Sequence, residues 1–127
     1  MRTTLIVGVT AAAIGFILGT EIPKSSKTAG YVVITGVTKD RNAAKEYFET
    51  APKYIQKSCK SEFLVIDRNT DIREGKKRSQ RGPLTIIARF DSKQSAIDCY
   101  ESSEYQRLIQ IRKPHTDWSF RITEGMR

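Results

Sequence analysis

The sequence is short of the residues on which metal sites and acid–base catalysis usually depend. It has one histidine, His115, and two cysteines, Cys59 and Cys99. The cysteines form no Cys-x-x-Cys pair, and a structural zinc site needs about four ligands at closer spacing. No nucleophile with a neighbouring base stands out either. We therefore expect no metal ion and no cofactor.

Acidic side chains are also scarce relative to basic ones. Lys and Arg number 22 against 14 Asp and Glu, which gives a formal net charge of +8 at pH 7. This balance favours contact with anionic surfaces, which include lipid headgroups, nucleic acid and acidic proteins, without choosing among them. Hydrophobic residues make up 39% of the 127 residues, enough for one globular domain and too many for a disordered chain.

Charged side chains are absent between Arg2 and Glu21. This length is close to the lower limit for a helix that crosses a membrane. A cleaved secretory signal looks similar, but the Ala-rich triplet 11–13 lies inside the apolar run and not after it. We predict a single-pass membrane anchor over residues 1–22, with an exported, periplasmic protein after signal cleavage as the alternative. A polar linker follows at 23–30.

Small residues recur every four positions within this segment, at Ala11, Gly15 and Gly19. In a helix they share one face, and small side chains on one face let a second membrane helix approach closely. The pattern predicts a membrane or partner contact along that face.

Residues 31–127 alternate between strand-like and helix-like patterns. β-branched and aromatic runs indicate strands, and apolar residues spaced by three and four indicate amphipathic helices. We expect Asp40 to cap the first helix, Pro52 to kink or interrupt it and Ser103 to cap the last helix. The expected elements are a strand at 31–37, a helix from Asp40 past Ile55, strands at 62–68 and 83–90, helices at 92–100 and 103–113, and a strand at 117–123.

This order is the ferredoxin-like βαββαβ arrangement, an α+β fold with an antiparallel sheet and helices on one face. The first three predicted strands carry apolar residues on both faces. In a sheet with one solvent-exposed face, apolar and polar residues alternate along each strand. The second face therefore needs a cover, which a second copy of the chain supplies through a symmetric contact. We predict a homodimer, with a subunit of a larger membrane complex as the other candidate partner.

Several stretches resemble one known family. They are "GYVVITGVTKD", "AAKEYFETAPKYIQK", "REG", "LTIIARFDSKQSAIDCYESSEYQRLIQIR" and "ITEG". Together they resemble the family catalogued as domain of unknown function 1330, of the dimeric α/β-barrel superfamily. The resemblance covers about residues 30–125 and implies the ferredoxin-like fold. The superfamily also includes small cofactor-free oxygenases and haem-degrading enzymes.

An arginine, Arg112, continues the apolar helix face that begins at Tyr105. A guanidinium on such a face needs a carboxylate or carbonyl partner, and Glu74 is one candidate. Either Tyr105 and Arg112 line a pocket that binds an anionic ligand, or Arg112 forms a structural ion pair that positions the last helix. We favour the structural ion pair, because no nucleophile or base is evident nearby.

The loop at 68–81 is strongly basic. Next to an anchor, such a loop suits anionic headgroups or an acidic protein, and a solvated loop is the simplest interpretation. Nucleic-acid binding is not expected, because no aromatic stacking residues accompany the charge. Its basic residues include Arg73, Lys76, Lys77, Arg78 and Arg81.

Cys59 and Cys99 fall near the C-terminal ends of the two predicted helical regions. In a ferredoxin-like fold the two helices lie side by side and run roughly parallel, which allows their ends to meet. A disulfide is therefore one hypothesis, and a pair of buried free thiols is the other.

For function, we predict a membrane-tethered or exported accessory and binding domain that is not an enzyme. The alternative is a cofactor-free oxygenase or an isomerase-like enzyme that binds a small anionic ligand in a pocket lined by Tyr105 and Arg112.

Overall fold

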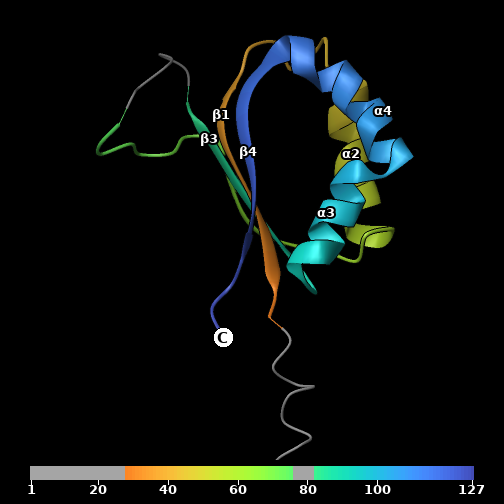
Figure 1. The fold of residues 1–127 in the computed structure, drawn as a ribbon. Helices are drawn as coiled ribbons and strands as arrows, with labels where there is room; N and C mark the ends of the chain where they lie inside the picture. The colour runs from red at the N-terminus through yellow and green to blue at the C-terminus, as the bar shows by residue number, and fades with distance from the viewer. Residues whose placement is uncertain (1–27, 76–81) are drawn as a thin grey trace, which may run out of the picture.

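The computed structural model describes residues 28–75 and 82–127 (Figure 1). The predicted anchor, with Ala11, Gly15 and Gly19, lies outside these residues. The elements are β1 (Gly30–Thr38), α2 (Lys45–Lys57), β2 (Glu62–Asp67), β3 (Leu84–Phe90), α3 (Lys93–Glu101), α4 (Ser103–Arg112), η1 (Lys113–His115) and β4 (Thr116–Glu124).

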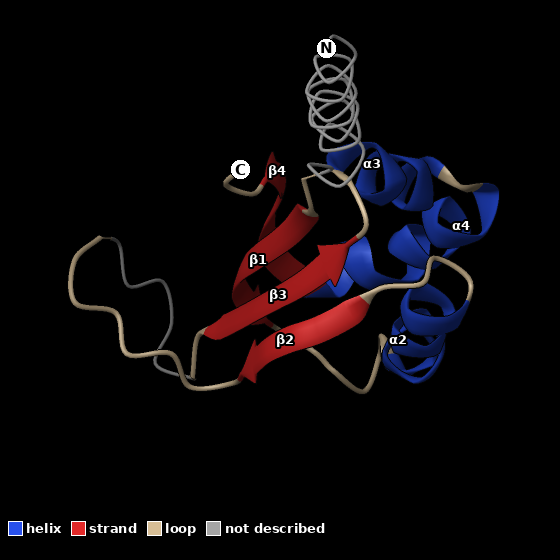
Figure 2. Cartoon of the chain, turned by 90° about the horizontal axis from the view of Figure 1, so that it is seen from below, coloured by secondary structure: helices blue, strands red, loops and turns tan. Residues whose placement is uncertain are grey.

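The four strands form an antiparallel sheet in the order β2-β3-β1-β4. The central strand β1 pairs with β3 on one side and with β4 along its whole length on the other. The helices α2, α3 and α4 lie on one face of this sheet, as Figures 1 and 2 show from two directions. The prediction of an α+β fold with a four-stranded antiparallel sheet is confirmed.

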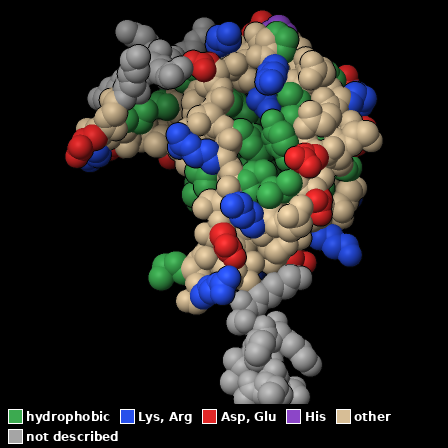
Figure 3. All heavy atoms as spheres, viewed as in Figure 1, with side chains coloured by type: hydrophobic (Ala, Val, Ile, Leu, Met, Phe, Trp, Pro, Cys, Tyr) green, Lys and Arg blue, Asp and Glu red, His purple; other side chains and the backbone are tan. Residues whose placement is uncertain are grey.

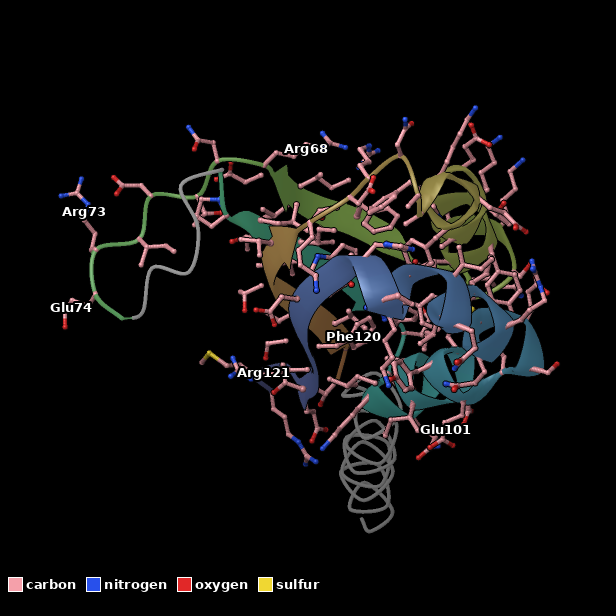
Figure 4. All side chains as sticks on the ribbon, turned by 90° about the horizontal axis from the view of Figure 1, so that it is seen from above. Arg68, Arg73, Glu74, Glu101, Phe120 and Arg121 are labelled. Atoms are coloured by element: carbon pink, nitrogen blue, oxygen red, sulfur yellow. A yellow bond between two sulfur atoms is a disulfide. The ribbon has the colours of Figure 1, made fainter. Side chains whose placement is uncertain are left out.

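Alternation along the strands decides which side chains face the helices. On β1, Val32 and Ile34 are 6% and 5% exposed and form part of the core beneath the helices. On β4, Phe120 points toward the helices and the adjacent Arg121 points away from them (Figure 4). Hydrophobic side chains gather in the hollow between β4 and the helices (Figure 3). The core therefore lies in this one layer between sheet and helices.

The helix boundaries differ from the predictions in two places. Asp40 accepts a hydrogen bond from the Ala43 amide, 3.0 Å, but this turn precedes α2, which begins at Lys45. Pro52 lies inside α2 without interrupting it. The N-cap of α4 is Ser102 and not the predicted Ser103, because the Ser102 hydroxyl accepts a hydrogen bond from the Tyr105 amide.

The C-terminal end of α2 is fixed to α3. Cys59 and Cys99 form a disulfide, with 5.8 Å between their Cα atoms. One turn earlier on α2, the Tyr54 hydroxyl donates a hydrogen bond of 2.9 Å to the Ser102 hydroxyl. This end of the helical layer is therefore held by a covalent bond and a hydrogen bond together.

The edge strand β2 is much more exposed than the rest of the sheet. Leu64, Val65 and Ile66 are 47%, 36% and 48% exposed. The pairing of β2 with β3 shifts register between Phe63 and Val65, which is a bulge or irregularity. Three consecutive apolar side chains thus meet solvent at one edge of the domain.

Candidate functional site

A cavity of about 450 Å³ lies between α2 and the sheet. This volume falls in the range typical of small-molecule sites. The sheet contributes apolar side chains from β1, β2 and β3, including Ile34, Phe63, Ile66 and Ile86, and β4 contributes Trp118. The walls are therefore mainly aliphatic and aromatic.

The helix α2 supplies one continuous wall of this cavity. Tyr47, Phe48, Ala51, Pro52 and Ile55 all line it. Their spacing of three and four residues places them on one side of a helix. The uninterrupted passage of α2 through Pro52 keeps this wall in a single piece.

Two arginines contribute the positive charge of the cavity lining. The guanidinium carbon of Arg41 lies 4.1 Å from the centroid of the Phe48 ring, a cation–π contact. Arg68 comes from the end of β2 (Figure 4). Among the described residues that line the cavity there is no Asp, Glu or His. Its lining is thus apolar with positive charge only.

A third arginine, Arg112, lies behind two of the aromatic side chains that line the cavity. It is 4% exposed, and its guanidinium carbon lies 4.7 Å from the Trp118 ring centroid and 5.2 Å from that of Tyr47. One of its terminal nitrogens donates to the Thr116 hydroxyl at 3.4 Å, and its Nε has no hydrogen-bond partner. Arg112 therefore carries an incompletely satisfied buried charge, which is costly.

The predicted carboxylate partner of Arg112 is not formed. Glu74 is exposed on the loop after β2, well away from the helices (Figure 4). No carboxylate of the described residues makes a salt bridge with Arg112. The nearby aromatic rings take the place that the sequence analysis gave to a carboxylate.

Two buried tyrosines meet beside Arg112. The hydroxyl oxygens of Tyr47 and Tyr105 are 2.6 Å apart and share a hydrogen bond. Burial raises the pKa of Tyr47 and of Tyr105, and the nearby Arg112 guanidinium acts on both pKa values in the opposite direction. Both phenols are therefore protonated at neutral pH. One hydroxyl hydrogen fills the shared bond, which leaves the other available to a second acceptor.

The predicted site residues are only partly brought together. Tyr105 and Arg112 are close neighbours, but they are 1% and 4% exposed and lie behind the cavity wall instead of lining it. Arg73 is exposed and pairs with Asp71 at 3.0 Å. The remaining predicted basic-loop residues, Lys76, Lys77, Arg78 and Arg81, lie outside the described residues.

The residues that form the cavity itself were not predicted as a site. Phe48, Trp118 and Arg41 were not singled out from the sequence, and Tyr47 is both a cavity residue and part of the buried core. Pro52 inside the predicted helix was the one available signal, because a proline in a helix interior removes a backbone hydrogen bond and so marks an irregular position.

Two solved structures of similar fold give context. A protein of unknown function from Rhodopseudomonas palustris is 9% identical with a TM-score of 0.60, covering 80% of this chain and 85% of that one. SnoaB, a cofactor-independent oxygenase from Streptomyces nogalater, is 10% identical with a TM-score of 0.50, covering 80% of this chain and 96% of that one. No curated protein matches the sequence significantly. At these identities the likeness shows the fold alone.

The prediction of a membrane-tethered accessory domain, and of a membrane localisation, is wrong. It placed the function in an anchor and a partner complex, whereas the fold is shared with an oxygenase and holds a ligand-sized cavity. Within residues 28–75 and 82–127, no helix has the length and hydropathy needed to cross a membrane.

The resemblance noted in the sequence is confirmed over nearly the whole domain. The model of one family matches from Ala29 to Met126, which includes every strand and helix described above. The chain belongs to the family described as domain of unknown function 1330 (DUF1330).

Proposed function

We propose that the domain is a cofactor-free enzyme that binds a small, planar organic anion between α2 and the sheet. The observation that supports this best is the lining of the 450 Å³ cavity, which is aromatic and aliphatic with arginine as its only charged residue type among the described residues. Such a lining favours a flat apolar body that carries delocalised negative charge.

Each charged or polar group has a role in this proposal. Arg41 and Arg68 attract the anion to the cavity. Arg112 acts from behind Tyr47 and Trp118, where its buried charge lowers the energy of negative charge that develops in the cavity. The Tyr47–Tyr105 pair supplies a neutral hydroxyl donor, because the raised pKa values keep both phenols protonated.

The reaction class follows from the absence of a base among the described lining residues. The substrate must lose its proton readily, as an activated methylene beside aromatic rings does. Its carbanion adds to dioxygen, which forms a C–O bond and a peroxide anion that takes up a proton. Loss of water from this hydroperoxide leaves a ketone, so one oxygen atom enters the product and the other leaves in water. An isomerase would instead return the proton to a different carbon.

The first experiment tests binding with two dyes of similar shape. Anilinonaphthalenesulfonate is anionic and N-phenylnaphthylamine is neutral, and Trp118, the only tryptophan in the sequence, reports binding through energy transfer. We expect the full-length protein to prefer the anion by about tenfold, as one charge-assisted contact allows. Arg41→Gln should reduce this preference, and Arg73→Gln, on the exposed loop, should not. Equal affinity for both dyes would contradict the proposal.

The second experiment tests the reaction. Anthrone has an activated methylene between two aromatic rings, and its oxidation consumes one dioxygen and yields anthraquinone and water. We expect oxygen uptake above the protein-free rate, and less uptake with Arg41→Gln. Proton exchange at the methylene without oxygen uptake would favour the isomerase. Neither signal with anthrone, together with no anion preference in the dye experiment, would overturn the proposed function.

The exposed apolar edge supports pairing of two copies. We propose that Leu64, Val65 and Ile66 of β2 contribute to a homodimer contact, as exposed apolar patches often do. Val65→Asp should yield monomers in sedimentation velocity, whereas Lys57→Asp at the exposed end of α2 should not. A monomeric wild-type protein at micromolar concentration would contradict this pairing.

A further inference from the structure

A second, much smaller cavity adjoins the first. Its volume is about 20 Å³, and four of the side chains that line it, Ile34, Ile55, Phe63 and Ile86, also line the large cavity. The small cavity extends from these shared residues toward α3, where Ala96 lines it. The two spaces are therefore neighbours within one core.

The lining of the small cavity is almost wholly apolar. It consists of aliphatic side chains, aromatic rings and Cys99, which is held in the disulfide. A buried water needs two to four polar partners, and apolar cavities of protein cores stay dry and take up apolar molecules instead. A volume of about 20 Å³ exceeds the roughly 10–15 Å³ that one water-sized molecule requires. The space thus suits a very small apolar molecule.

We propose that the small cavity is the dioxygen site of this domain. This inference rests on the proposed oxygenase function and adds to it the location of the second substrate. Dioxygen is apolar, is little larger than water, and gains from a site that water does not occupy.

The Tyr47–Tyr105 pair connects the two cavities. Tyr47 lines the large cavity, Tyr105 lines the small one, and their hydroxyl oxygens are 2.6 Å apart. Dioxygen becomes negatively charged as it accepts electrons from the organic anion. The charge of Arg112 and the hydroxyl groups of the tyrosine pair then stabilise it through space, since Arg112 lies against the Tyr47 ring and the Tyr47 hydroxyl meets that of Tyr105.

Xenon is the probe for this site, because it enters dry apolar cavities whether or not a reaction takes place. Methyl NMR spectra of the full-length protein are recorded under increasing xenon pressure. We expect saturable shifts of the Ala96 and Val32 methyl signals, because these two residues line only the small cavity. Shifts confined to the surface, or to side chains of the large cavity alone, would overturn the dioxygen site.

Two matched substitutions separate the cavities. Ala96→Val and Ala51→Val each add two methyl groups at a helical position that is 1% exposed, in the small and in the large cavity respectively. We expect Ala96→Val to abolish the xenon shifts and to raise the KM for dioxygen several-fold with little change in the KM for anthrone. Ala51→Val should keep the xenon shifts and raise the KM for anthrone. The opposite pattern would overturn the assignment.

Kinetics of the wild-type protein give a test that needs no variant to fold. Xenon should compete with dioxygen and leave the KM for anthrone unchanged. Oxygen uptake that is insensitive to xenon overturns the dioxygen site and leaves the proposed function in place. Xenon binding in a protein that consumes no oxygen with any activated methylene overturns the proposed function, and the dioxygen site with it.

Discussion

The two ends of α2 are held to the rest of the domain in opposite ways. At the C-terminal end, a disulfide and the Tyr54–Ser102 hydrogen bond join it to α3 and to the start of α4. In its N-terminal half, Tyr47 meets Tyr105 and Arg112, and the buried Arg112 guanidinium has an Nε without a hydrogen-bond partner. The first end is built for stability, and the second keeps costly polar groups beside a cavity. That difference is what we expect when one end of a helix serves folding and the other serves chemistry.

The largest effect should come from breaking the C-terminal attachment. The double substitution Cys59→Ala, Cys99→Ala removes the disulfide and should lower the free energy of unfolding by about 2–4 kcal/mol. Urea unfolding of both proteins measures the change. Dye binding under native conditions should stay the same, because neither sulfur lines the large cavity. A loss of dye binding in a variant that remains folded would show that the two ends are coupled.

A smaller loss should follow from removing one hydroxyl of the tyrosine pair. Tyr47→Phe leaves the buried Tyr105 hydroxyl without its partner, which should cost about 1–3 kcal/mol of unfolding free energy. Replacing both tyrosines with phenylalanine should recover part of that loss, because no polar group is then left unsatisfied. A double-mutant cycle by urea unfolding measures the coupling. Strictly additive losses would mean that the shared hydrogen bond contributes nothing.

The same pair predicts how stability depends on pH. Burial raises the pKa of Tyr105 in the folded protein, whereas in the unfolded chain the phenol ionises near its ordinary pKa of about 10. The unfolded state therefore loses this proton first as pH rises. The contribution of Tyr105 to stability should be constant below pH of about 10 and then fall by about 1.4 kcal/mol per pH unit. Urea unfolding in alkaline buffers should show this decline, and Tyr105→Phe should reduce it.

Substitution of Arg112 tests whether this residue has a structural or a functional role. Arg112→Met keeps most of the side-chain volume and removes a buried charge that has no carboxylate partner. The free energy of unfolding should therefore change by less than about 1 kcal/mol, or even rise. Anion affinity should fall several-fold in the dye experiment. A loss of about 3–5 kcal/mol would instead indicate that Arg112 is half of a structural ion pair.

The smallest effect should come from Arg107, which offers a contrast on the same helix. Its guanidinium contacts Glu46 and Glu104 at 3.1 Å each, and it is half exposed. Solvent and salt weaken such surface pairs, so Arg107→Gln should leave both urea unfolding and dye binding nearly unchanged. A large effect on unfolding or on dye binding would show that an exposed charge on α4 matters as much as the buried charge of Arg112.

The predictable part of the molecule is the part set by local patterns. Alternation in β4 and the apolar spacing of α2 and α4 give the fold correctly, including the burial of Tyr105, Leu108, Ile109 and Arg112 along one stripe. The cavity was not predicted, because it depends on which side chains of distant elements fail to fill a space. The partner of Arg112 was not predicted for a related reason. Charge suggests a carboxylate, whereas the Arg112 guanidinium lies against two aromatic rings, and such contacts leave no mark in sequence spacing.

The disulfide has a consequence for the integrity of the chain. It closes the polypeptide into a covalent ring between positions that are 40 residues apart, and the exposed Arg68 and Arg73 lie within that ring. A single cut by trypsin, which cuts after arginine and lysine, would therefore open the ring at this loop without releasing a fragment. The two halves would stay joined until a reductant separated them. A molecule cut once in this way would keep its mass while the disulfide is intact, and two shorter chains would be seen only after reduction.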